Sequence, residues 1–139
     1  MRLRLRNILW AMALLTGLAL AGCAEPGLDR VDVTWETDPP PRWGLYPGYR
    51  QEIPCPKGAV YRVDVFFKGK AFTGGSVSDT GSALAFQPTA GAKDIEVERD
   101  GRNRMALYAI LRNENGQSRR LLALRIELKG DKMVFEFPK

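Results

Sequence analysis

Two turn signals in the C-terminal third constrain the fold more than any other feature of the sequence. Asn115-Gly116 and Gly130-Asp131 are residue pairs typical of two-residue β-hairpin turns. Each turn predicts a strand register independently, and both set Leu124, Ile126 and Leu128 against neighbouring strands. A slip of one residue would move this row to the opposite face. The sequence therefore predicts two consecutive hairpins that share one apolar face.

The predicted registers can be written out as residue pairs. The first turn pairs Leu111 with Arg120, Ala109 with Leu122, Leu107 with Leu124, Met105 with Ile126, and Arg104 with Glu127. The second turn pairs Leu128 with Met133, Ile126 with Phe135, and Arg125 with Glu136. A three-residue loop at 99–101 brings Ile95 and Val97 onto the same face, so residues 93–138 are predicted to form a four-stranded meander. Residues 104–111 are rich in good helix formers, and a helix there is the alternative.

Upstream, apolar and polar residues alternate in two further segments. Val31, Val33 and Trp35 alternate with polar residues, and the same period recurs in residues 61–67, which is typical of half-buried strands. Residues 70–79 and 81–88 give two weaker candidates. With 139 residues, one domain is expected. The predicted fold class is all-β, a small antiparallel β-sandwich or barrel of about eight short strands within residues 30–139.

Residues 37–58 are predicted to be a long loop, because they hold six of the nine prolines. Long loops in small domains are often functional. Trp43, Tyr46 and Tyr49 lie in this segment. One interpretation is a recognition arm that meets a protein, glycan or lipid partner. The alternative is that the aromatic side chains fold back and cover an open end of the sheet.

The N-terminus combines three arginines, an apolar run and a cysteine. Arg2, Arg4 and Arg6 precede residues 8–21, which carry no charge and are too few to span a bilayer, since a spanning helix needs about 20 residues. A removed secretory signal fits this arrangement better than an uncleaved anchor or a buried helix. The small residues before Cys23 resemble the lipobox of bacterial lipoproteins.

That resemblance implies that residues 1–22 are a cleaved signal peptide and that the Cys23 sulfur carries diacylglycerol. Residues 23–29 would then be a lipidated tether that holds the protein on a membrane. Ala24 follows the cysteine where an aspartate would favour the inner membrane. The resemblance therefore implies the outer membrane, with the protein facing the periplasm.

The chain has two cysteines, Cys23 and Cys55. Export to an oxidising compartment would favour a disulfide between them, but lipid on Cys23 rules that bond out. Cys55 is then interpreted as a small, partly buried apolar residue. The alternative is a reactive thiol or a disulfide between two chains.

Composition argues against several classes of function. The sequence contains no histidine, which removes the usual general base and the commonest metal ligand. The formal charge of +5 falls to +2 without Arg2, Arg4 and Arg6, since 18 basic residues then face 16 acidic ones. We therefore expect no enzyme, no cofactor, no metal and no nucleic-acid partner.

Arginines near the predicted Asn115-Gly116 turn form a candidate basic patch. Arg112, Arg119 and Arg120 lie on the two strands that the turn joins. Such a patch would suit anionic lipid headgroups or an acidic partner. A solvated face that protects the sheet is the alternative.

Two functions are consistent with these features. The first is a lipid-anchored, non-catalytic module that binds another envelope protein as an assembly accessory. The second is an inhibitor or immunity lipoprotein that blocks a periplasmic enzyme. Residues 80–86, Thr-Gly-Ser-Ala-Leu-Ala-Phe, with residues 98–101 after them, resemble the serine- and glycine-rich loop of membrane-bound lysozyme inhibitors. The second glycine and the paired cysteines of that family are missing here.

Overall fold

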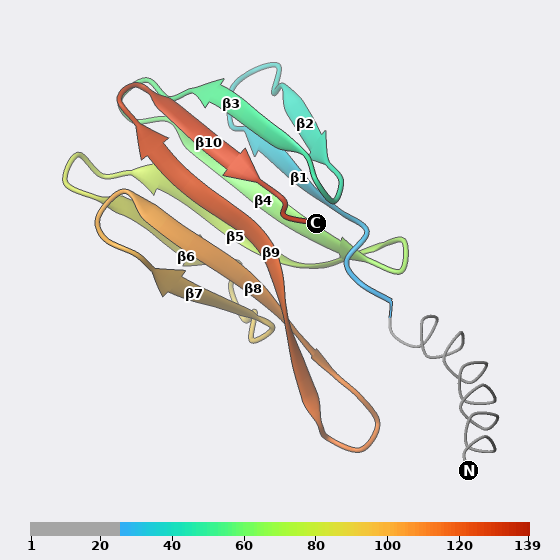
Figure 1. Ribbon diagram of the computed structural model, residues 1–139. Helices are drawn as coiled ribbons and strands as arrows, with labels where there is room; N and C mark the ends of the chain where they lie inside the picture. The colour runs from blue at the N-terminus through green and yellow to red at the C-terminus, as the bar shows by residue number, and fades with distance from the viewer. Residues whose placement is uncertain (1–25) are drawn as a thin grey trace, which may run out of the picture.

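The computed structural model describes residues 26–139, which form ten strands in two five-stranded antiparallel sheets (Figure 1). Sheet A has the strand order β2-β1-β4-β5-β6, and sheet B has the order β3-β10-β9-β8-β7. The strands of sheet A are β1 (Arg30–Trp35), β2 (Arg42–Leu45), β4 (Val60–Phe67), β5 (Lys70–Asp79) and β6 (Leu84–Pro88). The strands of sheet B are β3 (Arg50–Pro54), β7 (Ile95–Arg99), β8 (Arg104–Arg112), β9 (Ser118–Lys129) and β10 (Lys132–Glu136).

The predicted all-β class is confirmed, and of the two predicted architectures the structure is a sandwich. The segment with helical composition, residues 104–111, forms strand β8, which lies between β9 and β7 in sheet B. Its buried positions Met105, Leu107 and Ala109 alternate along the strand, and this burial outweighs the helix propensity of the residues.

The prediction of a continuous loop at 37–58 was wrong, because this segment contributes strands β2 and β3. Both are edge strands, β2 beside β1 and β3 beside β10, and an edge position tolerates nearby prolines. The turn between them carries the chain from sheet A to sheet B. In this turn the Tyr49 amide donates to the Tyr46 carbonyl at 2.9 Å, and Gly48 has a φ of 94°.

The predicted C-terminal meander is confirmed, with strands β7 to β10 adjacent in chain order. The Gly130-Asp131 turn has the predicted register, with Leu128 opposite Met133 and Ile126 opposite Phe135. Ile95 and Val97 lie opposite Ala109 and Leu107, on the expected face. The β7–β8 loop starts two residues later than predicted, however, because the Asp100 amide pairs with the Arg104 carbonyl at 3.0 Å.

The predicted register of the β8–β9 hairpin is correct only in the half that lies away from the turn. The pairs Leu107 with Leu124, Met105 with Ile126, and Arg104 with Glu127 are present. Toward the turn the register is shifted by one residue, giving the pairs Ala109 with Leu121 and Leu111 with Arg119. The turn has three residues rather than two, with Gly116 at a φ of 81°. Ala123 forms a bulge in β9 that compensates for the extra turn residue.

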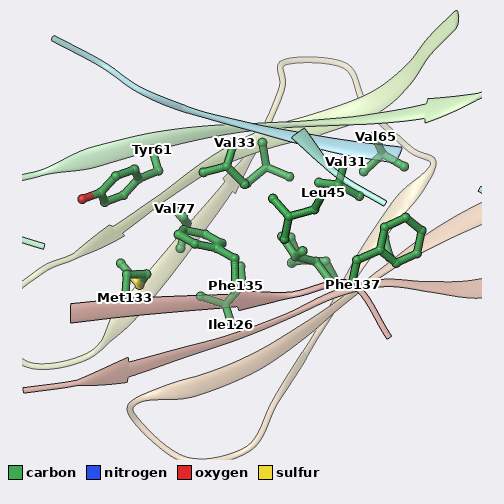
Figure 2. Close-up of a cluster of buried hydrophobic side chains, with 14 of the residues drawn as sticks. Val31, Val33, Leu45, Tyr61, Val65, Val77, Ile126, Met133, Phe135 and Phe137 are labelled. Carbon is green, nitrogen blue, oxygen red and sulfur yellow. The ribbon is translucent and has the colours of Figure 1, made fainter. Parts of the chain in front are cut away.

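The core lies between the inner faces of the two sheets (Figure 2). Tyr61 from β4 and Phe135 from β10 meet edge to face, with ring centroids 5.7 Å apart. Aliphatic side chains of sheet A surround this pair, among them Val33 and Leu45, which are fully buried. This continuous contact makes the two sheets one domain.

The outer face of β1 differs from the prediction of a half-buried strand. Asp32 and Thr34 are buried, although the alternation placed them on a solvent face. The Asp32 carboxylate accepts a hydrogen bond from Arg30 at 3.0 Å and lies 3.8 Å from the Arg42 guanidinium. Gly44, its neighbour on β2, has no side chain to fill this space. The buried Asp32 side chain therefore lies between two arginines that remain partly exposed.

Candidate functional site

The described chain starts at one end of the sandwich, which we call the N-terminal end. Three turns lie there together with residues 137–139: the β2–β3 turn (residues 46–49), the β4–β5 turn (residues 68–69) and the β8–β9 turn (residues 114–116). Arg119 donates to the Pro26 carbonyl at 2.9 Å, and the Gly48 amide donates to the Phe137 carbonyl at 2.7 Å. Figure 1 shows the β4–β5 turn, the C-terminus and the start of the described chain together at this end.

The chain is attached to the sandwich before its first strand begins. The Asp29 amide donates to the Phe66 carbonyl at 2.9 Å, and the Asp29 carboxylate accepts the Gly69 amide. Leu28 is buried. Residues 26–29 were predicted to be part of a lipidated tether at residues 23–29, and in the structure these four residues pack on the domain. Cys23, the predicted lipidation residue, lies outside the described residues.

Sequence reasoning missed the β4–β5 turn that holds Asp29. Lys68 and Gly69 have φ values of 52° and 78°, and Phe67 pairs with Lys70 across them. These angles suit a two-residue hairpin turn with a left-handed backbone. The available signal was a Lys-Gly pair between two strand candidates.

The three aromatic residues of the predicted recognition arm lie in different environments. Trp43 lies on β2, opposite Val33 of β1, and its side chain packs against the core. Tyr46 and Tyr49 are 47% and 55% exposed, and their rings meet edge to face at 5.5 Å. Trp43 therefore covers the core, whereas Tyr46 and Tyr49 form an exposed pair in the β2–β3 turn.

The arginines of the predicted basic patch are engaged with other groups. Arg112 pairs with Asp94 at 2.9 Å. Arg120 pairs with Glu96 at 3.0 Å and stacks over the Tyr108 ring at 3.6 Å. Arg119 holds the Pro26 carbonyl, as described above. The guanidinium groups of Arg112 and Arg120 are thus paired with carboxylates, one just before strand β7 and one within it.

A groove of about 670 Å³ runs over the outer face of sheet B. Ala106, Tyr108 and Val134 contribute to its lining. Side chains of both charges surround them, including Arg125, which lies 4.0 Å from Glu136. Nine of the fourteen lining residues are charged, five basic and four acidic, and a surface with both signs can select a binding partner by charge complementarity.

Cys55 and Tyr61 lie near the opposite end of the sandwich. Burial raises the pKa of the Cys55 thiol, and the Asp79 carboxylate adds to this effect. Burial also raises the pKa of Tyr61 to about 12, and its hydroxyl donates to the Pro54 carbonyl. A buried thiol whose pKa is raised is a poor nucleophile. This environment supports the interpretation of Cys55 as a small apolar residue.

Within residues 26–139, no three His, Cys, Asp or Glu side chains are placed to hold a metal ion together. No helix in the same part of the chain is long and apolar enough to cross a membrane. Comparison with family models, with curated proteins and with solved structures gave no match.

Proposed function

We propose that this chain is a membrane-anchored bacterial envelope lipoprotein and that its β-sandwich is a non-catalytic module that binds another envelope protein. One observation carries the anchoring part of the proposal. Within residues 26–139, the first strand begins at Arg30, and both sheets are built from strands that follow it. Cleavage before Cys23 would therefore remove no part of either sheet. Acyl chains on the new N-terminal residue would hold the sandwich on the membrane, in the outer membrane facing the periplasm.

The groove on sheet B supports the binding part of the proposal. Its base includes Ala106 and Tyr108, while Arg125 and Glu136 offer both charges at its rim. Such a surface combines apolar contact with ion pairs that select the partner by charge. The groove lies on the outer face of sheet B, and most of its lining residues are in the parts of β8 and β9 away from the N-terminal end, so an anchored protein would keep much of it accessible.

The anchoring is tested with the two cysteines of the chain. Cells that express the protein are fed a labelled fatty acid, and the envelope is fractionated. Cys23→Ala should abolish the label and release the protein from the membrane fraction. Cys55→Ala is the matched control and should keep both. Label that persists in the Cys23→Ala protein would contradict the proposal.

The partner surface is tested by filling the groove. Ala106→Tyr places a bulky side chain on its base, whereas Ser76→Tyr places the same side chain on the outer face of sheet A. After crosslinking in intact envelopes, Ala106→Tyr should lose a species of defined mass that Ser76→Tyr retains. Loss of that species in a Tyr46→Ser, Tyr49→Ser double variant instead would assign the contact to the β2–β3 turn.

An inhibitor or immunity lipoprotein is the second candidate. One observation favours it: Arg102, the residue directly after the second segment that resembles lysozyme inhibitors, is bonded to the first segment. Arg102 donates to the Ser82 carbonyl at 2.8 Å, and its own carbonyl accepts the Leu84 amide at 2.9 Å. Residues 24–139 added to a lysozyme turbidity assay should then slow lysis, and Ser82→Arg should remove the effect. Unchanged lysis would leave the binding module as the function.

A further inference from the structure

The N-terminal end of the sandwich must lie close to any lipid on Cys23. The chain is held from Pro26 onward by the bonds of Arg119 and Asp29. Only residues 24 and 25 separate Cys23 from Pro26. Since a residue spans at most about 3.6 Å, the Cα atoms of Cys23 and Pro26 are at most about 11 Å apart. A lipid anchor on Cys23 would therefore bring this end, and not the opposite one, to the membrane surface.

Exposed side chains at this end have the chemistry of a membrane interface. Tyr46 and Tyr49 are exposed, and tyrosine rings are enriched at the level of lipid headgroups because one edge is apolar and the other polar. Lys68 and Lys70 are exposed on the β4–β5 turn. Long lysine side chains can extend along apolar groups and place their charge among anionic headgroups.

Contacts at the ends of strands β1 and β4 link the turn that carries the two tyrosines with the turn that carries the two lysines. Arg30, which precedes the Val31–Leu45 pair, lies over the Phe66 ring at 3.9 Å. Lys68 lies over the Phe67 ring at 5.4 Å, and Phe67 packs edge to face on Phe72. The β2–β3 and β4–β5 turns thus flank the entry of the N-terminal chain. A bilayer reached through Cys23 would meet both turns.

The acidic groups at this end are partly engaged. Asp29 accepts the Gly69 amide, and Asp94 pairs with Arg112. Glu114 lies at the tip of the β8–β9 turn, where it is exposed. Within residues 26–139, Lys68 and Lys70 have no ion pair; both side chains are exposed, and the Lys68 ammonium lies over the Phe67 ring. Their positive charge complements an anionic lipid surface.

We propose that the N-terminal end is a membrane-docking surface, in which Tyr46 and Tyr49 enter the headgroup layer of an anionic bilayer while Lys68 and Lys70 bind its headgroups. The inference rests on the proposed lipidation of Cys23. Each lysine near such a surface strengthens the attraction roughly fivefold. Docking would fix the orientation of the sandwich and leave the sheet B groove facing the periplasm.

The orientation is measured with the lipidated protein in vesicles made of equal parts phosphatidylcholine and phosphatidylglycerol. A fluorophore is attached to an introduced cysteine, either Lys139→Cys beside Gly48 or Lys57→Cys at the opposite end. The unsubstituted protein is the blank, because Cys55 is buried. Spin-labelled headgroup lipids should quench the label at position 139 severalfold more than the label at position 57.

Two conditions test the charge contribution. The difference in quenching should shrink in vesicles of phosphatidylcholine alone. It should also shrink in 1 M salt, where the screening length falls from about 10 Å at 0.1 M to about 3 Å. A Lys68→Gln, Lys70→Gln double variant should reduce it in the mixed vesicles. The matched control is Lys129→Gln, Lys132→Gln, which removes two lysines around the β9–β10 turn and should leave the quenching unchanged.

The tyrosine contribution and the anchoring are read separately. A folded Tyr46→Ser, Tyr49→Ser double variant should still float with the vesicles through its lipid but lose the quenching at position 139. Equal quenching of the two labels in a protein that floats would overturn the docking surface alone. An unsubstituted protein that fails to float would overturn both the anchor and the docking surface. Unchanged quenching in the tyrosine variant, with loss of a crosslinked protein, would assign the pair to a protein partner instead.

Discussion

Sheet A keeps Asp32 and Thr34 buried on its outer face, whereas sheet B exposes its charged residues there. Asp32 is only 5% exposed, and its carboxylate lies between the side chains of Arg30 and Arg42. On sheet B, Arg120 pairs with Glu96 and Glu98 while all three remain half-exposed. In sheet A only the carboxylate is withdrawn from solvent, because the Arg30 and Arg42 side chains are 36% and 67% exposed. Removing this carboxylate should therefore be costlier than removing a carboxylate of sheet B, where both members of each pair are solvated.

Glycine marks a second difference between the two sheets. Strands β2 and β5 of sheet A contain Gly44, Gly74 and Gly75, whereas the strands of sheet B contain no glycine. A Cβ atom on Gly74 would collide with the Val63 carbonyl of the neighbouring strand β4. Sheet A therefore depends on close backbone contact at a point where sheet B depends on side-chain packing.

The inner faces of both sheets are apolar, and a substitution where they meet should cause the largest loss of stability. Phe135→Ala removes a fully buried ring that contacts Tyr61 of the other sheet, so it should lower the free energy of unfolding by about 3–5 kcal/mol. Urea denaturation measures this change. Val97→Ala, at a position that is 37% exposed, should cost much less. Equal losses in the two variants would show that the inner faces do not form one core.

Tyr61 gives the shared core a pH dependence. Its pKa of about 12 lies above the ordinary value of 10, because burial favours the neutral phenol. The folded state therefore holds this proton more tightly than the unfolded chain. The corresponding stability, about 2–3 kcal/mol, is present below pH 10 and is lost as the pH rises from 10 to 12.

Thermal unfolding measured across this pH range tests the prediction, with absorbance of the phenolate as the second readout. Tyr61→Phe should make the loss of stability with pH less steep, although it also removes the hydrogen bond to Pro54. Tyr49→Phe changes an exposed ring and should keep the steep loss. A steep loss that persists in Tyr61→Phe would assign the pH dependence to other groups.

Gly74→Ala should destabilise the protein by about 1–3 kcal/mol, because strands β4 and β5 must separate to admit the methyl group. The matched control is Gly27→Ala, since nothing lies within 4 Å of a Cβ atom there. Chemical denaturation of both variants gives the comparison. A Gly74→Ala protein as stable as Gly27→Ala would remove this difference between the sheets.

The sequence predicted sheet B better than sheet A because the strands of the meander are joined by short turns. The parity of a short turn decides which side chains face the core, so the faces of Ile95, Leu107 and Ile126 could be derived. The register shift next to the β8–β9 turn could not be derived, because it needs both a longer turn and the bulge at Ala123. Sheet A pairs β1 with β4 across the whole of residues 37–58. No local pattern reports such a long-range pairing.

The candidate site was only partly predictable for the same reason. The exposure of Tyr46 and Tyr49 follows from their place in a proline- and glycine-containing turn. The pairing of Arg120 with Glu96 does not, because it depends on how β7 is aligned two strands away. The docking of Asp29 on Gly69 joins residues that are 40 positions apart. Sequence patterns identify which side chains are exposed more readily than which ones meet.

The smallest stability losses, from breaking one ion pair on each outer face, test whether the outer faces of the two sheets differ. Asp32→Ala should cost about 1–3 kcal/mol, since it leaves Arg30 and Arg42 without their buried partner. Glu136→Ala breaks a pair with Arg125 at 4.0 Å in which both side chains are half-exposed, and it should change stability by less than about 0.5 kcal/mol. Urea denaturation measures both losses, and high salt should reduce the small loss in Glu136→Ala, because salt screens an exposed pair. If Asp32→Ala were as mild as Glu136→Ala, burial of the carboxylate would contribute nothing to sheet A. The arrangement of Arg30, Asp32 and Arg42 would then be a solvated surface pair like those of sheet B.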